Sequence, residues 1–124
     1  MITGVGIDVV AISRIAEKMR KPEFKNAVFT KAEIAYCEEG GNKMQHYAAR
    51  LAVKEAFLKA TGKGMAYDIN NFQRIEVCRD GNGQPFIKLN GSFEVMKEAE
   101  KWVGMHVSIT HEADTAIAVV ILEK

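Results

Sequence analysis

Small and β-branched residues alternate at the start of the chain, and this pattern predicts a β-strand over residues 2–10. One face of the strand carries β-branched residues, whereas the other carries two glycines and an acid. Glycines beside an acid leave room for another backbone or a ligand to come close. The two faces consist of Val5, Ile7 and Val9 on one side and Gly4, Gly6 and Asp8 on the other.

Apolar residues then recur at helical spacing. Residues 11–21 predict a helix, and Pro22 marks its end. Thr30 and Glu33 form a T-x-x-E capping box, which predicts the start of a second, short helix.

The longest helical pattern covers residues 42–61, and Gly62 is placed to end that helix. Glu55 falls within its apolar series, although a charge is seldom buried without a partner or a metal. Glu55 is therefore the most informative anomaly of the sequence. The apolar series consists of Met44, Tyr47, Ala48, Leu51, Ala52 and Leu58.

The second half of the chain predicts four strands and one helix. A strand over residues 72–79 leads into a strong hairpin turn at residues 80–83. We expect a single α+β domain, residues 1–124, with a mainly antiparallel sheet packed with one long and several short helices. The remaining elements are a strand over 84–89, a helix from Ser92 to about residue 102, and strands over 105–111 and 115–123.

Composition excludes several classes of function. The chain has 124 residues, 48% of them hydrophobic and 27% charged, as is ordinary for a globular domain with its own core. Its net charge of +1 argues against bulk nucleic acid as a partner. We expect no membrane span and no signal peptide, because the apolar start is short and lacks a basic leader. Cys37 and Cys78 match no metal-ligand spacing and are expected to be reduced thiols of a cytoplasmic protein.

Asp8 and Glu55 are the first candidates for chemistry. If the long helix packs across the first strand, the two carboxylates meet, and like charges in a partly buried place need a cation. Magnesium commonly takes one or two protein carboxylates and completes its shell with water and phosphate oxygens. Spacing alone leaves open that each acid is instead paired with an arginine or with backbone amides.

Two lysines follow Glu55 in the sequence, at the end of the long predicted helix and directly after it. Lys59 lies one turn beyond Glu55, which fits either an ordinary Glu–Lys helix pair or a cation that neutralises a leaving group. Lys63 and Gly64 belong to a T-G-K-G tract that is able to hold a phosphate, although glycine at a helix end is usually only a cap. The polar strand face at residues 106–111 lacks a nucleophile elbow and a full set of zinc ligands.

Several segments resemble, in order and spacing, the motifs of bacterial holo-acyl-carrier-protein synthases, which are phosphopantetheinyl transferases. G-V-G-I-D resembles the family's G-x-G-x-D opening, and R-L-A-V-K-E-A-F-L-K-A resembles its R-x-x-x-K-E-A-x-x-K-A helix. H-V-S-I-T-H resembles its H-V-S-I-[ST]-H strand. The resemblance covers essentially the whole chain. The segments are residues 4–10, 50–60, 72–77, 80–85 and 106–111.

The resemblance implies transfer of the 4′-phosphopantetheine arm of coenzyme A to a serine of apo-acyl carrier protein, in support of fatty acid biosynthesis. It implies a magnesium ion held by Asp8 and Glu55, with Lys59 beside the phosphate. It also implies a homotrimer whose sites are shared between neighbouring chains. The other implied roles are contacts with coenzyme A for Arg50, Lys63, Gly64 and His111, and a contact with the acidic carrier protein for Arg14.

Two alternatives stay open at this stage. The first is a transferase that modifies carrier domains of peptide or polyketide synthases, although such enzymes usually have two such halves in one chain. The second is a non-catalytic coenzyme A or nucleotide binding module, or a structural trimer. The presence of Asp8, Glu55 and Lys59 together argues against the second.

Overall fold

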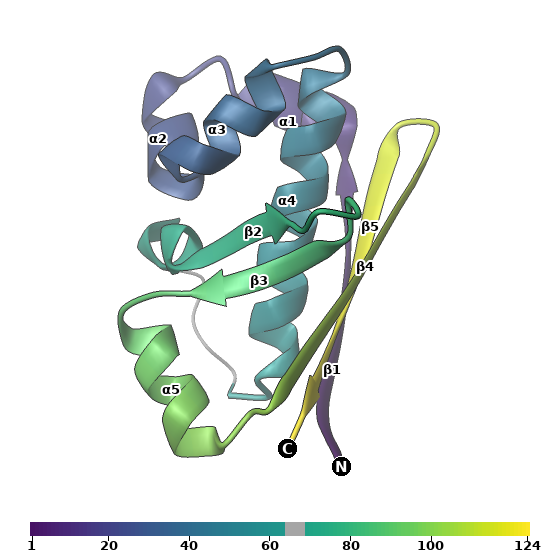
Figure 1. Ribbon diagram of the computed structural model, residues 1–124. Coiled ribbons are helices and arrows are strands. Elements are labelled where there is room, and N and C mark those ends of the chain that lie inside the picture. Colours follow the sequence, from purple (N-terminus) through teal and green to yellow (C-terminus); the bar gives the residue numbers. More distant parts are fainter. Residues whose placement is uncertain (64–68) are drawn as a thin grey trace.

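The computed structural model describes residues 1–63 and 69–124 and confirms an α+β architecture (Figure 1). A long central helix is surrounded by a three-stranded sheet, a two-stranded sheet and shorter helices. The elements in chain order are β1 (Ile2–Ala11), α1 (Ile12–Lys18), α2 (Pro22–Val28), α3 (Lys31–Glu38), α4 (Lys43–Ala60), the 3-10 helix η1 (Ile69–Arg74), β2 (Ile75–Arg79), β3 (Pro85–Leu89), α5 (Ser92–Glu100), β4 (Gly104–Glu112) and β5 (Thr115–Glu123).

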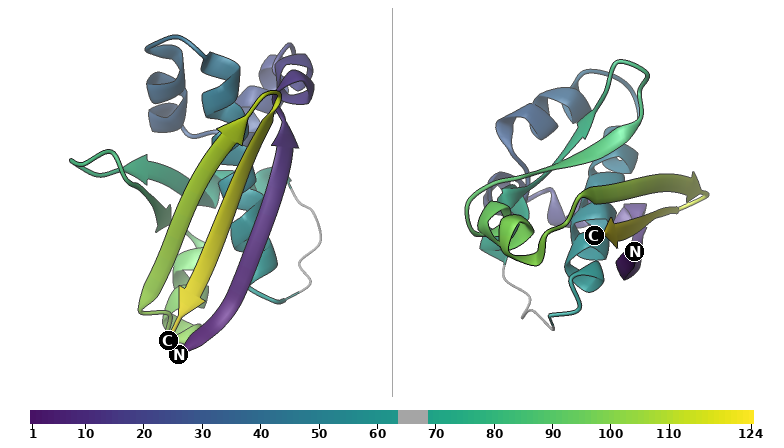
Figure 2. Two further views of the ribbon diagram at one scale, coloured as in Figure 1. Left: turned by 90° about the vertical axis from the view of Figure 1, so that its right-hand side faces the viewer. Right: turned by 60° about the horizontal axis from the view of Figure 1, so that its bottom comes forward.

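Every strand pair in the described part of the chain is antiparallel, and the strands form two sheets rather than one. The larger sheet has the order β1–β5–β4, and β2 pairs with β3 in the smaller one. The helix α4 packs against one face of the larger sheet, while no described element covers the opposite face (Figure 2, left). The larger sheet is therefore a platform with one covered face and one open face.

Small side chains let α4 lie close to the platform. On β5, the residues facing α4 are fully buried and include Ala116 and Ala118. The other side of α4 packs against aromatic residues: the ring of Phe57 lies 5.7 Å from that of Phe93 and 5.8 Å from that of Trp102, edge to face in both cases. Because α4 is enclosed on most sides, it is buried almost all round, which the predicted single apolar stripe did not anticipate.

The structure corrects three predicted elements. Pro22 does not merely end a helix but begins α2, where its missing N–H costs nothing at the first helical position. Residues 72–74 belong to η1, so β2 begins only at Ile75. The last helix ends at Glu100, before Lys101 adopts a left-handed φ of 60°.

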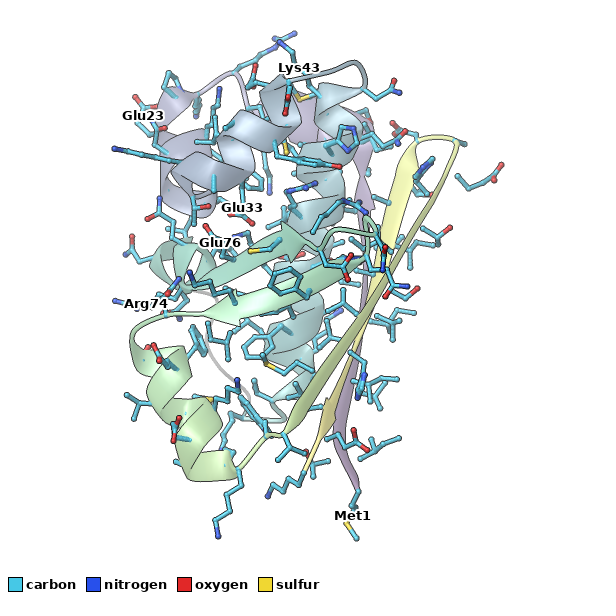
Figure 3. All side chains as sticks on the ribbon, in the orientation of Figure 1. Met1, Glu23, Glu33, Lys43, Arg74 and Glu76 are labelled. Carbon is cyan, nitrogen blue, oxygen red and sulfur yellow. The ribbon has the colours of Figure 1, made fainter. Side chains whose placement is uncertain are left out.

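A buried ion pair joins α4 to its neighbours. The Nζ atom of Lys54 lies 2.8 Å from Oε1 of Glu33, and it donates to the carbonyls of Phe72 and Ile75 at 2.7 and 2.8 Å. Both charged side chains are fully buried. Glu33 lies between α3 and β2 (Figure 3), and it accepts from the amides of Thr30, in the predicted capping box, and of Val77. This one carboxylate therefore connects α3, α4 and β2.

Candidate active site

The strand β1 touches the α4 backbone at its two glycines. A Cβ atom at Gly4 would lie 1.9 Å from the carbonyl oxygen of Ala60, and one at Gly6 would lie 1.8 Å from that of Ala56. No residue with a side chain fits at either position. Asp8 is the next residue on the same face of β1, so the glycines bring its carboxylate against the side of α4.

Asp8 is mostly buried, with 12% of its side chain exposed. Its Oδ1 atom accepts a hydrogen bond of 3.0 Å from Nζ of Lys59, which also donates to the carbonyl of Ile7 at 3.0 Å. When Glu55 is ionised, the buried Oδ2 atom has no hydrogen-bond donor among the described residues. A buried carboxylate oxygen without a donor is unfavourable and indicates that a cation or a donor belongs beside it.

Glu55 is the second carboxylate of the site. Burial, followed by the neighbouring Asp8 carboxylate, raises the pKa of Glu55 to about 8. The ammonium groups of Lys18 and Lys59 act in the opposite direction but do not offset these effects. The two acids predicted to meet across the strand and the helix are thus brought together, and they repel each other when both are ionised.

The residues present fit a magnesium ion. No group of three or more histidine, cysteine, aspartate or glutamate side chains gathers in residues 1–63 and 69–124, so the ligands identified in this part of the chain are the two carboxylates. A hard cation that takes one or two carboxylates and fills its shell with water and phosphate oxygens matches this set. The orphaned Oδ2 atom of Asp8 points to the same conclusion.

A cluster of cations lies on another side of α4. The guanidinium of Arg50 stacks 4.1 Å over the ring of Tyr36, and that of Arg79 lies 5.8 Å from the same ring. Neither arginine forms an ion pair with a described carboxylate, and both have a buried Nε atom without a partner in the described chain. Burial, and then the charges of Arg50, Arg79 and His111, lower the pKa of His46. Two guanidinium groups without an ionic partner, with the imidazoles of His46 and His111 near them, are typical of a site for an anion.

His111 and Arg79 also line a cavity of about 430 Å³ between the β2–β3 hairpin and β4. The wall is polar at Gln84 and Ser108 and apolar at Pro85. Arg50 and Glu55 are five residues apart on α4, which places their side chains about 140° apart around the helix axis. The cation cluster and the carboxylate pair therefore face different sides of α4.

A third feature is a groove of about 570 Å³ between α1 and η1. Three basic residues and one acid contribute charge to it, and two apolar residues form a wall. These residues are Arg14, Lys18 and Lys21, then Glu17, and then Phe24 and Ile69. The helix α1 packs against α4, and the charge of Lys18 acts on the pKa of Glu55, so the Lys18 end of the groove lies toward the carboxylate pair. A basic groove with an apolar wall suits an acidic protein surface that carries an exposed hydrophobic side chain.

Residues 4–120 match the model of the 4′-phosphopantetheinyl transferase superfamily. The chain is 38% identical to the holo-[acyl-carrier-protein] synthase of Cytophaga hutchinsonii, with 100% of this chain and 99% of the relative aligned. It is 41% identical to the synthase of Syntrophus aciditrophicus, over 99% and 97% of the two chains. The chain belongs to the holo-[acyl-carrier-protein] synthase family.

Solved structures of this family share the fold over the full chain. The synthase of Neisseria meningitidis superposes with a TM-score of 0.89 at 30% identity and covers 100% of both chains. The synthase of Chronobacterium ammoniagenes in complex with coenzyme A gives a TM-score of 0.82 at 32% identity, over 97% of this chain and 96% of that one.

The family resemblance also assigns Lys63 and Gly64 to coenzyme A. Lys63 forms an ion pair with Glu100 at the end of α5. Gly64 lies outside the described residues. The roles of Lys63 and Gly64 toward coenzyme A remain predictions.

Sequence reasoning missed part of the cation cluster. Tyr36, His46 and Arg79 were not singled out, although His46 stands four residues before Arg50 and hence on the same face of α4. Tyr36 and Arg79 gave no signal, because their relation to Arg50 depends on the packing of α3 and β2 against α4.

Proposed function

We propose that this protein transfers the 4′-phosphopantetheine moiety of coenzyme A to a serine of apo-acyl carrier protein, and so supports fatty acid biosynthesis in the cytoplasm. The products are holo-acyl carrier protein and adenosine 3′,5′-bisphosphate. The observation that carries the proposal is the joining of Asp8, Glu55 and Lys59 at one place between β1 and α4. Family membership over the full chain supports the same activity.

The reaction requires positioning and charge stabilisation rather than a nucleophile from the enzyme. The carrier serine oxygen forms a bond to the phosphorus that bears the pantetheine arm. The proton of the serine hydroxyl passes to a carboxylate of the site or to a water molecule. The bond from that phosphorus to the bridging oxygen breaks, and adenosine 3′,5′-bisphosphate leaves with the electron pair. This explains why the site offers carboxylates and cations but no activated serine or cysteine.

Each residue of the site has a defined part in this step. Asp8 and Glu55 would hold a magnesium ion, which when bound offsets the charge that develops on the diphosphate. Lys59 keeps 58% of its side chain exposed, so its ammonium group is accessible to a phosphate oxygen at the site and stabilises the leaving group there.

We propose that the cation cluster binds the remaining phosphate of coenzyme A. Arg50 and His111 are the predicted contacts, and Arg79 and His46 join them in the structure. A phosphate would supply the acceptor that the buried Nε atoms of the two arginines lack.

The groove beside α1 is the proposed dock for the carrier protein. Arg14 and Lys18 lie one helical turn apart, so both face an incoming acidic surface. Because the Lys18 end of the groove lies toward Glu55, a carrier docked there presents its serine close to the carboxylate pair.

We further propose that the protein assembles as a homotrimer through the open face of the larger sheet. Val5, Ile7 and Val9 are each 60% exposed on that face. The register pairs Ile7 with Val119 of β5, so the apolar surface continues across the sheet. Contiguous exposed apolar surface of this kind marks a protein interface. Neighbouring copies would also explain how one coenzyme A meets both the carboxylate pair of one chain and the cation cluster of another.

The trimer is testable by light scattering on a sizing column. Ile7→Glu should dissociate the assembly, because it places a charge within the buried interface. Val95→Glu is the matched control, since Val95 is equally apolar and 68% exposed but lies on α5. A wild-type protein that runs as a monomer would contradict the assembly.

Mass spectrometry tests the reaction itself. The protein is mixed with apo-acyl carrier protein, coenzyme A and magnesium, with EDTA as the metal control and a peptidyl carrier domain as a second acceptor. We expect the carrier to gain one phosphopantetheine on serine, and Asp8→Asn or Glu55→Gln to lower turnover by orders of magnitude. Glu94→Gln, at an exposed acid of α5, is the control. A folded protein that binds coenzyme A but modifies neither acceptor would be a binding module instead.

A further inference from the structure

The helix α1 has no N-terminal cap of its own. Its N-cap residue, Ala11, provides no side-chain acceptor, and the first turn contains no acid. With seven residues, α1 is also too short to be stable by itself. Its start must therefore be held by another part of the chain.

Asp114 holds it from the opposite end of the sequence. The two Asp114 carboxylate oxygens accept hydrogen bonds from the backbone N–H and the hydroxyl of Ser13, at 2.9 and 2.6 Å. The Asp114 carbonyl accepts from the amide of Ile12 at 2.8 Å. Three acceptors of one residue are thus directed at the first turn of α1, where a negative charge is also favoured by the helix dipole.

The position of Asp114 is itself fixed by the platform. Glu112 of β4 pairs with Thr115 of β5, and Ala113 adopts a positive φ of 50° in the two-residue turn between the strands. The hydroxyl of Thr115 closes the turn by donating to the carbonyl of Glu112 at 2.7 Å. Because Thr115 also pairs with Ala11 at the end of β1, the turn stands directly beside the start of α1.

We propose that Asp114 is a positioning residue that orients α1, and with it Arg14, for docking of the acyl carrier protein. Arg14 follows the capped residue Ser13 directly and lines the basic groove. The inference rests on the proposed docking at this groove. Asp114 acts through the helix and not on the carrier itself.

Steady-state kinetics of the full-length protein test the proposal. Loss of a cap weakens a helix start, and we expect Asp114→Ala to raise KM for apo-acyl carrier protein roughly three- to tenfold. The KM for coenzyme A and kcat should stay within about twofold, because the carboxylate pair and the cation cluster are untouched. Asp114→Asn should restore a near-normal KM, since asparagine caps a helix about as well as aspartate.

Thr115→Val is the matched control, because it removes a hydrogen bond of the same turn but none to α1. A rise in both KM values together with a fall in kcat for Asp114→Ala would show general damage and overturn the positioning role. So would a failure of asparagine to rescue the carrier KM.

An Arg14→Ala background separates this inference from the docking proposal. If Arg14→Ala raises the carrier KM and adding Asp114→Ala has little further effect, Asp114 acts through Arg14. If Arg14→Ala raises that KM and Asp114→Ala alone does not, the inference about Asp114 is wrong and the docking proposal stands. If Arg14→Ala leaves the carrier KM unchanged, docking at this groove is wrong. Hydrogen exchange then tests the cap by itself. Faster amide exchange over residues 12–18 in Asp114→Ala supports the cap, and unchanged exchange refutes it.

Discussion

The contact between β1 and α4 predicts that replacing Gly6 even by alanine destabilises the protein. The added Cβ would lie 1.8 Å from the carbonyl oxygen of Ala56 and 2.8 Å from the amide nitrogen of Ala60. Both are backbone atoms of a helix that is buried almost all round, so the obstacle cannot rotate away as a side chain would. The strand and the helix would have to separate by more than about 1 Å.

The energetic cost follows from this separation. Overpacking a core costs about 1–3 kcal/mol, and we expect Gly6→Ala to lie at the upper end, near 3 kcal/mol, because the clash is with backbone. For a chain of this size, such a loss lowers the melting temperature by about 10 °C. Asp8 is carried on the same strand face, so it would also move away from Glu55, and turnover should fall at least tenfold in the folded fraction.

Urea unfolding followed through Trp102, the one tryptophan of the chain, measures this loss. Gly40→Ala is the control, because a Cβ at Gly40 meets nothing within 4 Å and no left-handed φ is required there. If Gly6→Ala unfolded within about 0.5 kcal/mol of the wild type, the close approach of β1 to α4 would be refuted.

Two further predictions concern buried charges. Lys54→Met leaves the Glu33 carboxylate buried without its partner and should lower the free energy of unfolding by about 3–5 kcal/mol. Adding Glu33→Gln to this variant should recover much of the loss. If the losses of the two single variants simply added in the double variant, the pairing would be contradicted. Because the pKa of Glu55 in the folded, metal-free protein is raised to about 8, folding favours its protonated form, and the stability from this effect is lost as pH rises from about 4.5 to about 8. Glu55→Gln should remove that loss of stability. After allowance for the partial exposure of Glu55, we expect the free energy of unfolding in EDTA to exceed that of the wild type by about 1–2 kcal/mol at pH 8, with no difference near pH 4. Melting temperatures of the two proteins that change in parallel with pH would be evidence against this prediction.

The sequence was most informative where a pattern is local. Alternation along β1 separates Asp8 from the β-branched face, because successive side chains of a strand point to opposite sides. Helical spacing placed Glu55 and Lys59 on neighbouring turns of α4, and both were found at the site. The capping box of Thr30 and Glu33 was also confirmed. Each of these features depends on residues within a few positions of one another.

The features that the sequence did not predict depend on which helices and strands pack together. The spacing of α4 drew attention to Glu55, yet its two fully buried charges are Arg50 and Lys54, whose partners lie on α3, η1 and β2. No periodicity within α4 reveals a partner more than a dozen positions away.

Asp114 shows the limit most clearly. In the sequence it is an ordinary turn residue between two strands, and 101 positions separate it from the serine whose amide it caps. Its role arises because β1 ends beside the turn of the β4–β5 hairpin, so that the chain leaves the sheet and enters α1 within reach of that turn. A cap supplied by the sheet, and not by the residue before the helix, fixes a surface helix relative to the rigid part of the fold. The proposed docking surface requires a helix fixed in this way, because the serine of the carrier would have to reach the carboxylate pair from it.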